Sequence, residues 1–138
     1  MTQRTLVICK PDCVQRWIVT SVLQRIESTS LTLVGSKVTR LSTQVLEEHY
    51  AHLTSKPFFP SILSYMQSAP VVITVREWPN AVAIVRKMIG VTNPVDAAPG
   101  TIRGDFATTI DANIVHASED EAAAQQEIAR FFAGHELV

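Results

Sequence analysis

The amino-acid sequence predicts an α+β fold of the ferredoxin-like βαββαβ type, a mainly antiparallel four-stranded sheet with helices packed on one face and with additional helices. Two observations support this. Short segments with strand patterns alternate with segments whose apolar residues recur at three-and-four spacing, all within 138 residues. No linker, repeat or low-complexity segment interrupts them, so residues 1–138 are expected to form a single domain.

Each element is expected from its own local pattern. The strands are continuous apolar or alternating β-branched runs, and the helices follow capping residues or proline and end at glycine. In order, we expect a strand at 6–9, a helix from an Asp12 cap through Ile26, a strand at 31–39, a helix from Ser42 or Thr43 to Leu53, a helix at 61–66, a strand at 70–76, a helix at 81–89 ended by Gly90, a strand at 113–115, and a helix from a Ser118 cap with Glu121 at its third position towards Gly134.

The segment from Val91 to Asp105 has no periodicity and contains several turn-forming residues. It is therefore expected to be a loop, and a loop of this length in a compact domain is more often functional than idle.

Composition excludes several classes of partner. The formal net charge is −1 and the pI is near 6.4, so no general field attracts nucleic acid or an anionic membrane. The apolar run at the N-terminus is too short for a signal peptide or a membrane span. Cys9 and Cys13 lack the further ligands of a metal site, and their side chains are expected to diverge, which makes them reduced thiols. We expect a soluble, cytoplasmic protein.

Polar and cationic residues gather at the ends of the expected elements, where the fold can bring them to one cleft. A guanidinium fork, an ammonium and neutral donors would together hold an anion, although isolated surface charges are the more ordinary reading of each. These residues are Lys10, Arg86, Thr92, Arg103, Asn113 and His116.

His116 is the candidate for covalent chemistry. A lone histidine beside an apolar pair is often only a half-buried polar side chain. A strand-to-helix turn would instead place its imidazole near backbone N–H groups that stabilise a transferred anion. Glu127 can reach back along the next helix to orient the ring. The residues alone leave these two readings evenly balanced.

The motif "NIVHAS" at 113–118 resembles the active-site signature of nucleoside diphosphate kinases, and further blocks extend the similarity over nearly the whole chain. These blocks are "KPD" and "VQR" at 10–16, "EEHY" at 47–50, "KPFFP" at 56–60, "PVV" at 70–72, "TNP" at 92–94 and "PGTIRGDF" at 99–106. Within the last block "RGD" reads as a loop segment with a phosphate-binding arginine.

The resemblance implies reversible, ping-pong transfer of the γ-phosphoryl group from a nucleoside triphosphate to a nucleoside diphosphate, through a phosphohistidine at His116. Glu127 would orient the imidazole, with Lys10 and Tyr50 supporting the site. The residues implied in nucleotide binding are Lys10, Phe58, Arg86, Thr92, Arg103, Ile110 and Asn113.

The same resemblance implies partners and a cofactor. Phe58 would stack on the base, with Ile110 on its other face, and such stacking accepts purines and pyrimidines alike. Either Phe58 or its neighbour Phe59 is expected in the core. Mg²⁺ would be carried mainly by the nucleotide phosphates, without a protein metal site. A homo-oligomer, hexamer or tetramer, is also implied.

Several positions depart from the family pattern: Cys13, Trp17, Ala117 and Glu119. Trp17 stands where glycine is usual and is expected to need space in the packing of the first helix. Glu119 replaces an aspartate and is expected to alter any contact with an arginine such as Arg103. An alternative is therefore a nucleotide-binding regulatory or scaffold protein of this fold with impaired turnover. A third reading, an unrelated small-molecule sensor, leaves the motifs unexplained.

Overall fold

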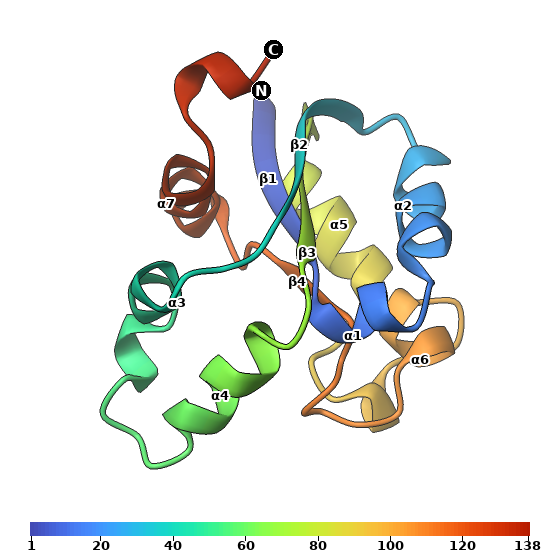
Figure 1. Cartoon of the computed structure of the whole chain (residues 1–138). Coiled ribbons are helices and arrows are strands. Elements are labelled where there is room, and N and C mark those ends of the chain that lie inside the picture. Colours follow the sequence, from blue (N-terminus) through green and yellow to red (C-terminus); the bar gives the residue numbers. More distant parts are fainter.

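The computed structural model describes residues 1–138 and contains one four-stranded antiparallel sheet in the order β2-β3-β1-β4 (Figure 1). The strands are β1 (Thr2–Cys9), β2 (Thr32–Thr39), β3 (Val71–Pro79) and β4 (Val115–Ala117). The α-helices are α1 (Pro11–Gln15), α2 (Val19–Glu27), α3 (Thr43–His49), α4 (Phe59–Met66), α5 (Ala81–Ile89), α6 (Ile102–Phe106) and α7 (Glu121–Phe131). Short 3₁₀ turns occupy Ala51–Leu53, Pro94–Asp96 and Gly134–Glu136. The α+β class and the four-stranded antiparallel sheet are confirmed.

Helices cover both faces of the sheet, so the expectation that they lie on one face is wrong. Alternate residues of β1 point to opposite sides, with Val7 in one apolar cluster and Leu6 in the other. In Figure 1, α2 and α5 lie on one side of the sheet, and α3, α4 and α7 lie on the other. This arrangement explains why the end of β1 is apolar at every position.

The expected first helix is two helices. Trp17 has a φ of 58°, in the left-handed region, and this conformation ends α1 before α2 begins. The Trp17 side chain is 91% exposed, so it does not need space in the helix packing. Asp12 is also not the N-cap, because Lys10 holds that position and Asp12 lies inside α1 with its side chain buried.

Two boundaries near the C-terminal half differ from expectation. The last strand, β4, begins at Val115 instead of 113, because Ile114 has a left-handed backbone that no strand continues. The segment 91–105 contains a 3₁₀ turn and the start of α6, whose N-cap Thr101 accepts a hydrogen bond from the Gly104 N–H at 3.0 Å. A helix of five residues is too short to show a helical period.

The cap of α7 is Asp120, whose carboxylate accepts from the Ala123 N–H at 2.7 Å, and not Ser118 as expected. The remaining cap assignments hold: Ser42 caps α3 and Gly90, with φ 85°, ends α5. None of the helices has both the length and the apolar run that crossing a membrane requires.

Cys9 and Cys13 are free thiols buried in the same apolar cluster. Hydrogen bonding with Cys13, followed by burial, raises the pKa of the Cys9 thiol. Both side chains thus lie in one apolar cluster, and no disulfide joins them.

Candidate active site

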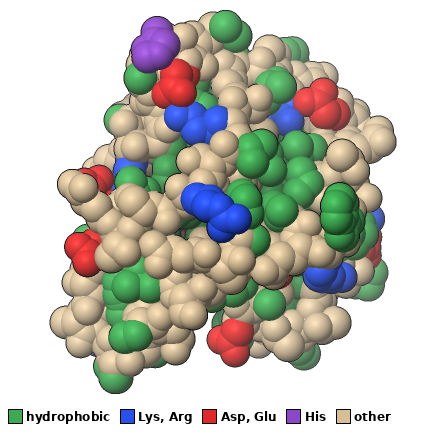
Figure 2. Space-filling view, viewed as in Figure 1, with side chains coloured by type: hydrophobic (Ala, Val, Ile, Leu, Met, Phe, Trp, Pro, Cys, Tyr) green, Lys and Arg blue, Asp and Glu red, His purple; other side chains and the backbone are tan.

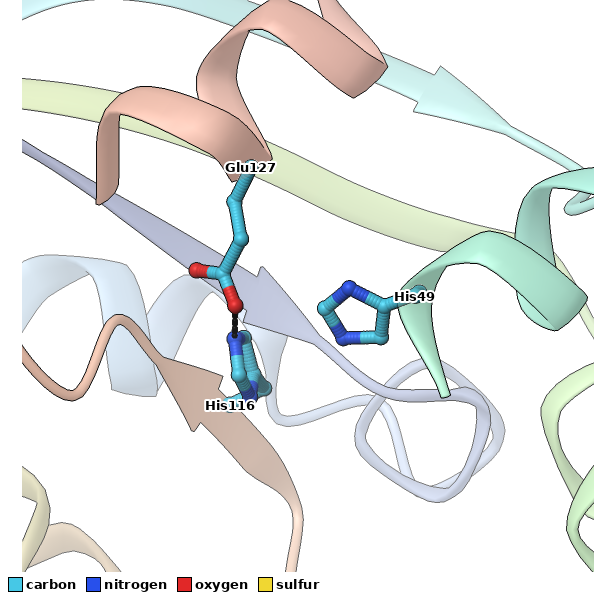
Figure 3. A group of neighbouring side chains, drawn as sticks. All are labelled: His49, His116 and Glu127. Carbon is cyan, nitrogen blue, oxygen red and sulfur yellow. Dashed lines mark hydrogen bonds and ion pairs between the residues drawn. The ribbon is translucent and has the colours of Figure 1, made fainter. Parts of the chain in front are cut away.

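His116 lies in β4, opposite Ile8 of β1, and its Nε2 is 2.9 Å from Oε2 of Glu127 on α7 (Figure 3). An ionised carboxylate only accepts hydrogen bonds, so Nε2 carries the proton in the neutral ring. The lone pair then resides on Nδ1. Because the side chain is 24% exposed, this ring is not sealed in the core. The expected orienting contact between Glu127 and His116 is therefore present in the geometry.

Glu127 is itself fixed by a second hydrogen bond. The Ser118 hydroxyl donates to Oε1 of Glu127 at 2.6 Å, and it accepts from the Leu6 N–H at 3.2 Å. Burial acts to raise the pKa of Glu127, but the hydrogen bonds and charge of His116 and the bond from Ser118 outweigh it, and the pKa is lowered. The carboxylate therefore stays ionised and its two oxygens each hold one defined partner.

His49, at the end of α3, is a site residue that the sequence reasoning missed. Its ring packs edge-on against His116, with centroids 4.9 Å apart, and against Tyr50 at 4.8 Å. Its Nδ1 lies 3.0 Å from the Arg130 guanidinium, which can only donate. Burial, with the nearby His116 second, lowers the pKa of His49 to about 3. His49 is thus neutral, with its proton on Nε2.

His49, His116 and Glu127 place one ligand-type atom each within 4.8 Å of one another (Figure 3). Two imidazoles and a carboxylate are a common zinc set. A metal would need a deprotonated ring nitrogen and a free carboxylate oxygen. Here Arg130 occupies Nδ1 of His49, and both oxygens of Glu127 have partners. The cluster is better described as a hydrogen-bonded support for His116.

Lys10 and Asn113 form a second part of the site. Lys10 follows β1, and its Nζ donates to Oδ1 of Asn113 at 2.8 Å, while Nδ2 of Asn113 donates to the Thr92 carbonyl at 3.1 Å. Burial, with the positive charge of Arg103 second, lowers the pKa of Lys10 to about 8. The structure thus brings together three predicted residues, although Thr92 participates through its backbone and its side chain is exposed.

Arg103 is buried under the same loop. It donates from Nε to the Asn113 carbonyl at 3.3 Å, and through its two terminal nitrogens to the carbonyls of Gly90 at 3.0 Å and Val115 at 2.6 Å. Three of its five N–H groups are used in this way, which leaves two for an anion. Burial, followed by the charge of Arg86, lowers the pKa of Arg103 to about 10. Arg103 thus both builds the loop and keeps free donors.

Arg86 reaches this region from α5 without a direct hydrogen bond to the other predicted residues. It lines a hollow of about 460 Å³ beside Gly90 and Thr101, and another of about 540 Å³ that includes Glu119. The hydrogen bonds of Arg103 go to backbone carbonyls, so the change to Glu119 alters none of them. Glu119 instead lines the same hollow as Arg86.

Phe58 and Ile110 are 49% and 52% exposed, while Phe59 is only 4% exposed. The expectation that one phenylalanine of the pair lies in the core is confirmed, and it is Phe59. Figure 2 shows a notch at the lower edge of the molecule, between the parts that Figure 1 labels α4 and α6. Phe58 directly precedes α4 and Ile110 closely follows α6 in sequence, so both exposed apolar side chains belong to the segments beside this notch.

The signal that could have revealed His49 lies on α7. Glu127, Arg130 and Phe131 recur at three-and-four spacing, and all contact His49 or His116. A histidine with a free ring nitrogen, an orienting carboxylate and neighbouring cations are the groups that transfer of an anionic group through a histidine would use.

Comparisons with known proteins agree with this class of reaction. The family described as nucleoside diphosphate kinase matches residues 3–137. A nucleoside diphosphate kinase of Thermus thermophilus is 49% identical over 136 residues, which is 99% of both chains. One from Archaeoglobus fulgidus is 45% identical, over 99% of this chain and 90% of the relative.

The solved structures agree as well. A halophilic nucleoside diphosphate kinase from Halobacterium salinarum, in complex with CDP, superimposes with a TM-score of 0.96 at 43% identity, over 100% of this chain and 92% of that chain. The chain belongs to the nucleoside diphosphate kinase family.

Proposed function

We propose that this chain is an active nucleoside diphosphate kinase, which transfers the γ-phosphoryl group between nucleotides through a phosphohistidine at His116. Membership of the family supports the activity. The single observation that carries the residue assignment is the 2.9 Å bond between Nε2 of His116 and Glu127, because it leaves Nδ1 as the ring nitrogen with an available lone pair.

In the first half-reaction, Nδ1 attacks the γ-phosphorus and the bond to the oxygen bridging the β- and γ-phosphates breaks. The nucleoside diphosphate leaves with the electron pair of that bond. As positive charge develops on the imidazole, the ionised Glu127 stabilises it through Nε2–H, in the way that a carboxylate supports the histidine of a hydrolase triad. A second nucleoside diphosphate then takes the phosphoryl group by the reverse of these steps.

The phosphates are neutralised by groups at the edge of the same loop. Phosphoryl transfer depends mostly on positioning and charge neutralisation. Lys10, Arg86 and the two unused N–H groups of Arg103 supply the positive charge, and Asn113 adds a neutral donor. Thr92 and Tyr50 border this set. Tyr50 is neutral at ordinary pH, since burial, followed by Glu127, raises its pKa to about 12.

Mg²⁺ would enter this site bound to the nucleotide phosphates and not to protein side chains. Lys10, Arg86 and Arg103 offer ammonium and guanidinium donors, which bind phosphate oxygens and not cations. Glu127, the carboxylate in the cluster with His116, has both oxygens engaged. When bound to the nucleotide, Mg²⁺ would supply further neutralisation of the phosphate charge.

Broad base specificity follows from stacking between Phe58 and Ile110, since every base presents a π-face. Both side chains are half exposed and thus available. The relative from Halobacterium salinarum was solved with CDP, which supports a pyrimidine nucleotide as one ligand here.

The assembly and location of the protein belong to the same proposal. β2 is an edge strand of eight residues with exposed Leu33 and Val38. The Val34 carbonyl accepts from the Val138 N–H at 2.9 Å, and the rest of such an edge favours pairing with another chain. This supports a homo-oligomer, a hexamer or tetramer, which sedimentation would establish.

Residues 1–138 would form one domain of a cytoplasmic protein. Figure 2 shows basic and acidic side chains scattered on the viewed face, without an extended basic patch for nucleic acid.

A coupled exchange assay with calorimetry of ADP binding tests this function against the scaffold alternative. The enzyme is expected to convert CDP, UDP and GDP to triphosphates with ATP, and to give the parallel double-reciprocal lines of a ping-pong mechanism. Binding of ADP without exchange would instead establish the non-catalytic protein. Neither the Lys10–Asn113 bond nor the His116–Glu127 bond favours that outcome.

A further inference from the structure

Ile114, two residues before His116, has a φ of 75° and is fully buried. A β-branched residue is strongly disfavoured in the left-handed region, because its Cβ crowds the backbone. Such a conformation persists only where the surrounding structure imposes it, and such residues cluster at functional sites. The groups that hold Ile114 are therefore of interest.

Both backbone polar groups of Ile114 are held from one short segment. Its N–H donates to Oδ2 of Asp12 at 3.0 Å, and its carbonyl accepts from the Lys10 N–H at 2.8 Å. The Asp12 carboxylate is buried, and the Tyr65 hydroxyl donates to its other oxygen. Burial, followed by that bond, raises the pKa of Tyr65, so its hydroxyl stays protonated as a donor. We call these contacts of Asp12 and Lys10 with Ile114 the Ile114 clamp.

The clamp sits between two parts of the active site. Asn113, just before it, directs its side chain to Lys10 and the Thr92 carbonyl. Val115, just after it, begins β4, which presents His116 opposite Ile8. The left-handed residue is the point at which the chain changes direction between these two placements. If Ile114 relaxed to negative φ, Asn113 and His116 could not both keep their positions.

We propose that Asp12 is a positioning residue for phosphoryl transfer, which holds Ile114 in its left-handed conformation and thereby aims both Asn113 and His116. It acts through the backbone and does not contact the reacting atoms. The inference rests on the proposed role of His116 as the nucleophile.

Asp12 has a simpler reading as an acid in the first turn of α1, where it would favour the helix dipole. Its two oxygens contradict that reading, because they accept from Ile114 and Tyr65. α1 is also only five residues long. The carboxylate is thus committed to a distant segment, 102 positions along the chain.

The test compares Asp12→Ala, Asp12→Asn and Tyr65→Phe in single-turnover phosphorylation by ATP, with the folded fraction of each variant measured by circular dichroism. Asp12→Ala is expected to lose about 100-fold in rate, the scale that a misplacement of about 1 Å costs. Asn keeps an oxygen for the Ile114 N–H, so Asp12→Asn is expected to recover most of that loss. Tyr65→Phe, which leaves the Ile114 bond intact, is expected to lose only a few-fold.

A double-mutant cycle separates aiming from general damage. Glycine adopts positive φ freely, so on an Ile114→Gly background the clamp is less needed. We expect the rate loss from Asp12→Ala to shrink there to about tenfold or less. Equal losses on both backgrounds would contradict the proposal. Because Ile114 is a core residue, the Ile114→Gly variants are compared at a temperature where they are folded. If they fold at no temperature, the comparison of Asp12→Ala with Asp12→Asn decides.

The remaining outcomes are also decisive. A normal rate in Asp12→Ala would overturn the inference. A loss in Asp12→Asn as large as that in Asp12→Ala would also overturn it, because the loss would then be due to the missing charge and not to the missing acceptor. If Asp12→Ala does not fold, Asp12→Leu fills the volume without an acceptor and replaces it. If neither folds, Asp12 serves the fold and the inference is wrong. Failure of the wild type to become labelled on His116 would instead refute the proposed function.

Discussion

Glu127 Oε2 lies 2.9 Å from Nε2 of His116, and the opposite oxygen of the same carboxylate accepts from Ser118 at 2.6 Å. Both oxygens of Glu127 are thus held, and the carboxylate fixes the plane and the tautomer of the imidazole. Changes to this pair, and to the groups packed around it, should therefore have separable effects on rate, pH dependence and stability.

Replacing Glu127 with glutamine is expected to lower kcat for exchange by about 100-fold, with little change in KM. The amide keeps the size of the side chain but removes the charge that stabilises the imidazolium. Stopped-flow measurement of both half-reactions provides the test. Ser118→Ala is the matched control and should lose much less, because the His116 bond remains. If both variants keep the wild-type kcat, Glu127 has no orienting role.

The pH dependence of kcat/KM should report Lys10. Its pKa is lowered to about 8, so the ammonium is present below that pH and is lost as the pH rises through it. We therefore expect kcat/KM to fall as the pH rises, with a midpoint within about one pH unit of 8. In Lys10→Met this limb should disappear along with most of the activity. A flat profile up to about pH 10, the ordinary pKa of lysine, would be inconsistent with this assignment.

His49 should make the protein sensitive to acid. Its folded pKa of about 3 lies below its unfolded value, so the unfolded state binds the proton more readily as the pH falls below about 6.5. The free energy of unfolding should therefore decrease between about pH 6 and 3, with a slope of at most about 1.4 kcal/mol per pH unit from this group. In His49→Gln, which keeps an acceptor for Arg130, urea titrations should show a shallower slope. An unchanged slope would remove His49 as the cause.

Phe58 and Phe59 should behave differently although they are neighbours. Phe58→Ala is expected to raise KM for all nucleoside diphosphates by about tenfold, since stacking contributes about 1–3 kcal/mol whichever base is bound. Phe59→Ala should instead destabilise the fold by about 3–5 kcal/mol, because that side chain is 4% exposed. Steady-state kinetics and thermal melting distinguish the two. A destabilised Phe58→Ala with normal KM would contradict the stacking role.

Trp17→Gly should stabilise the protein by about 1 kcal/mol. The indole is 91% exposed and its backbone has a φ of 58°, where glycine has no steric penalty. Calorimetry on the free chain, with exchange activity unchanged, would confirm this. A lower melting temperature would mean that Trp17 makes contacts that this chain alone does not contain.

Much of the fold followed from local patterns because the strongest signals were local. The buried run at 6–9, the alternating residues at 31–39 and Gly90 after the helix at 81–89 each specify an element without reference to the rest of the chain. The break at Trp17 was missed because a left-handed backbone at a residue other than glycine leaves no mark in hydrophobic spacing.

For the site, too, some residues could be predicted from the sequence and others depend on contacts between distant segments. Resemblance singled out His116, Glu127 and Lys10, and in the structure His116 bonds Glu127 and Lys10 bonds Asn113. The roles of Asp12 and Ser118 depend on contacts across 102 and 112 positions of the chain, which no local pattern records. Ser118 also fits a capping box in sequence, but Asp120 takes the cap and Ser118 supports Glu127 instead. Such competition between two acceptable caps is decided by tertiary structure.

The most direct measurement is labelling of the protein with γ-labelled ATP, followed by mapping of the phosphorylated residue. We expect a label that is labile in acid and stable in base, located on Nδ1 of His116, discharged by any nucleoside diphosphate, and absent from His116→Ala. A label that persists in His116→Ala, or a folded wild-type protein that exchanges phosphoryl groups without becoming labelled, would contradict the assignment of His116 as the nucleophile.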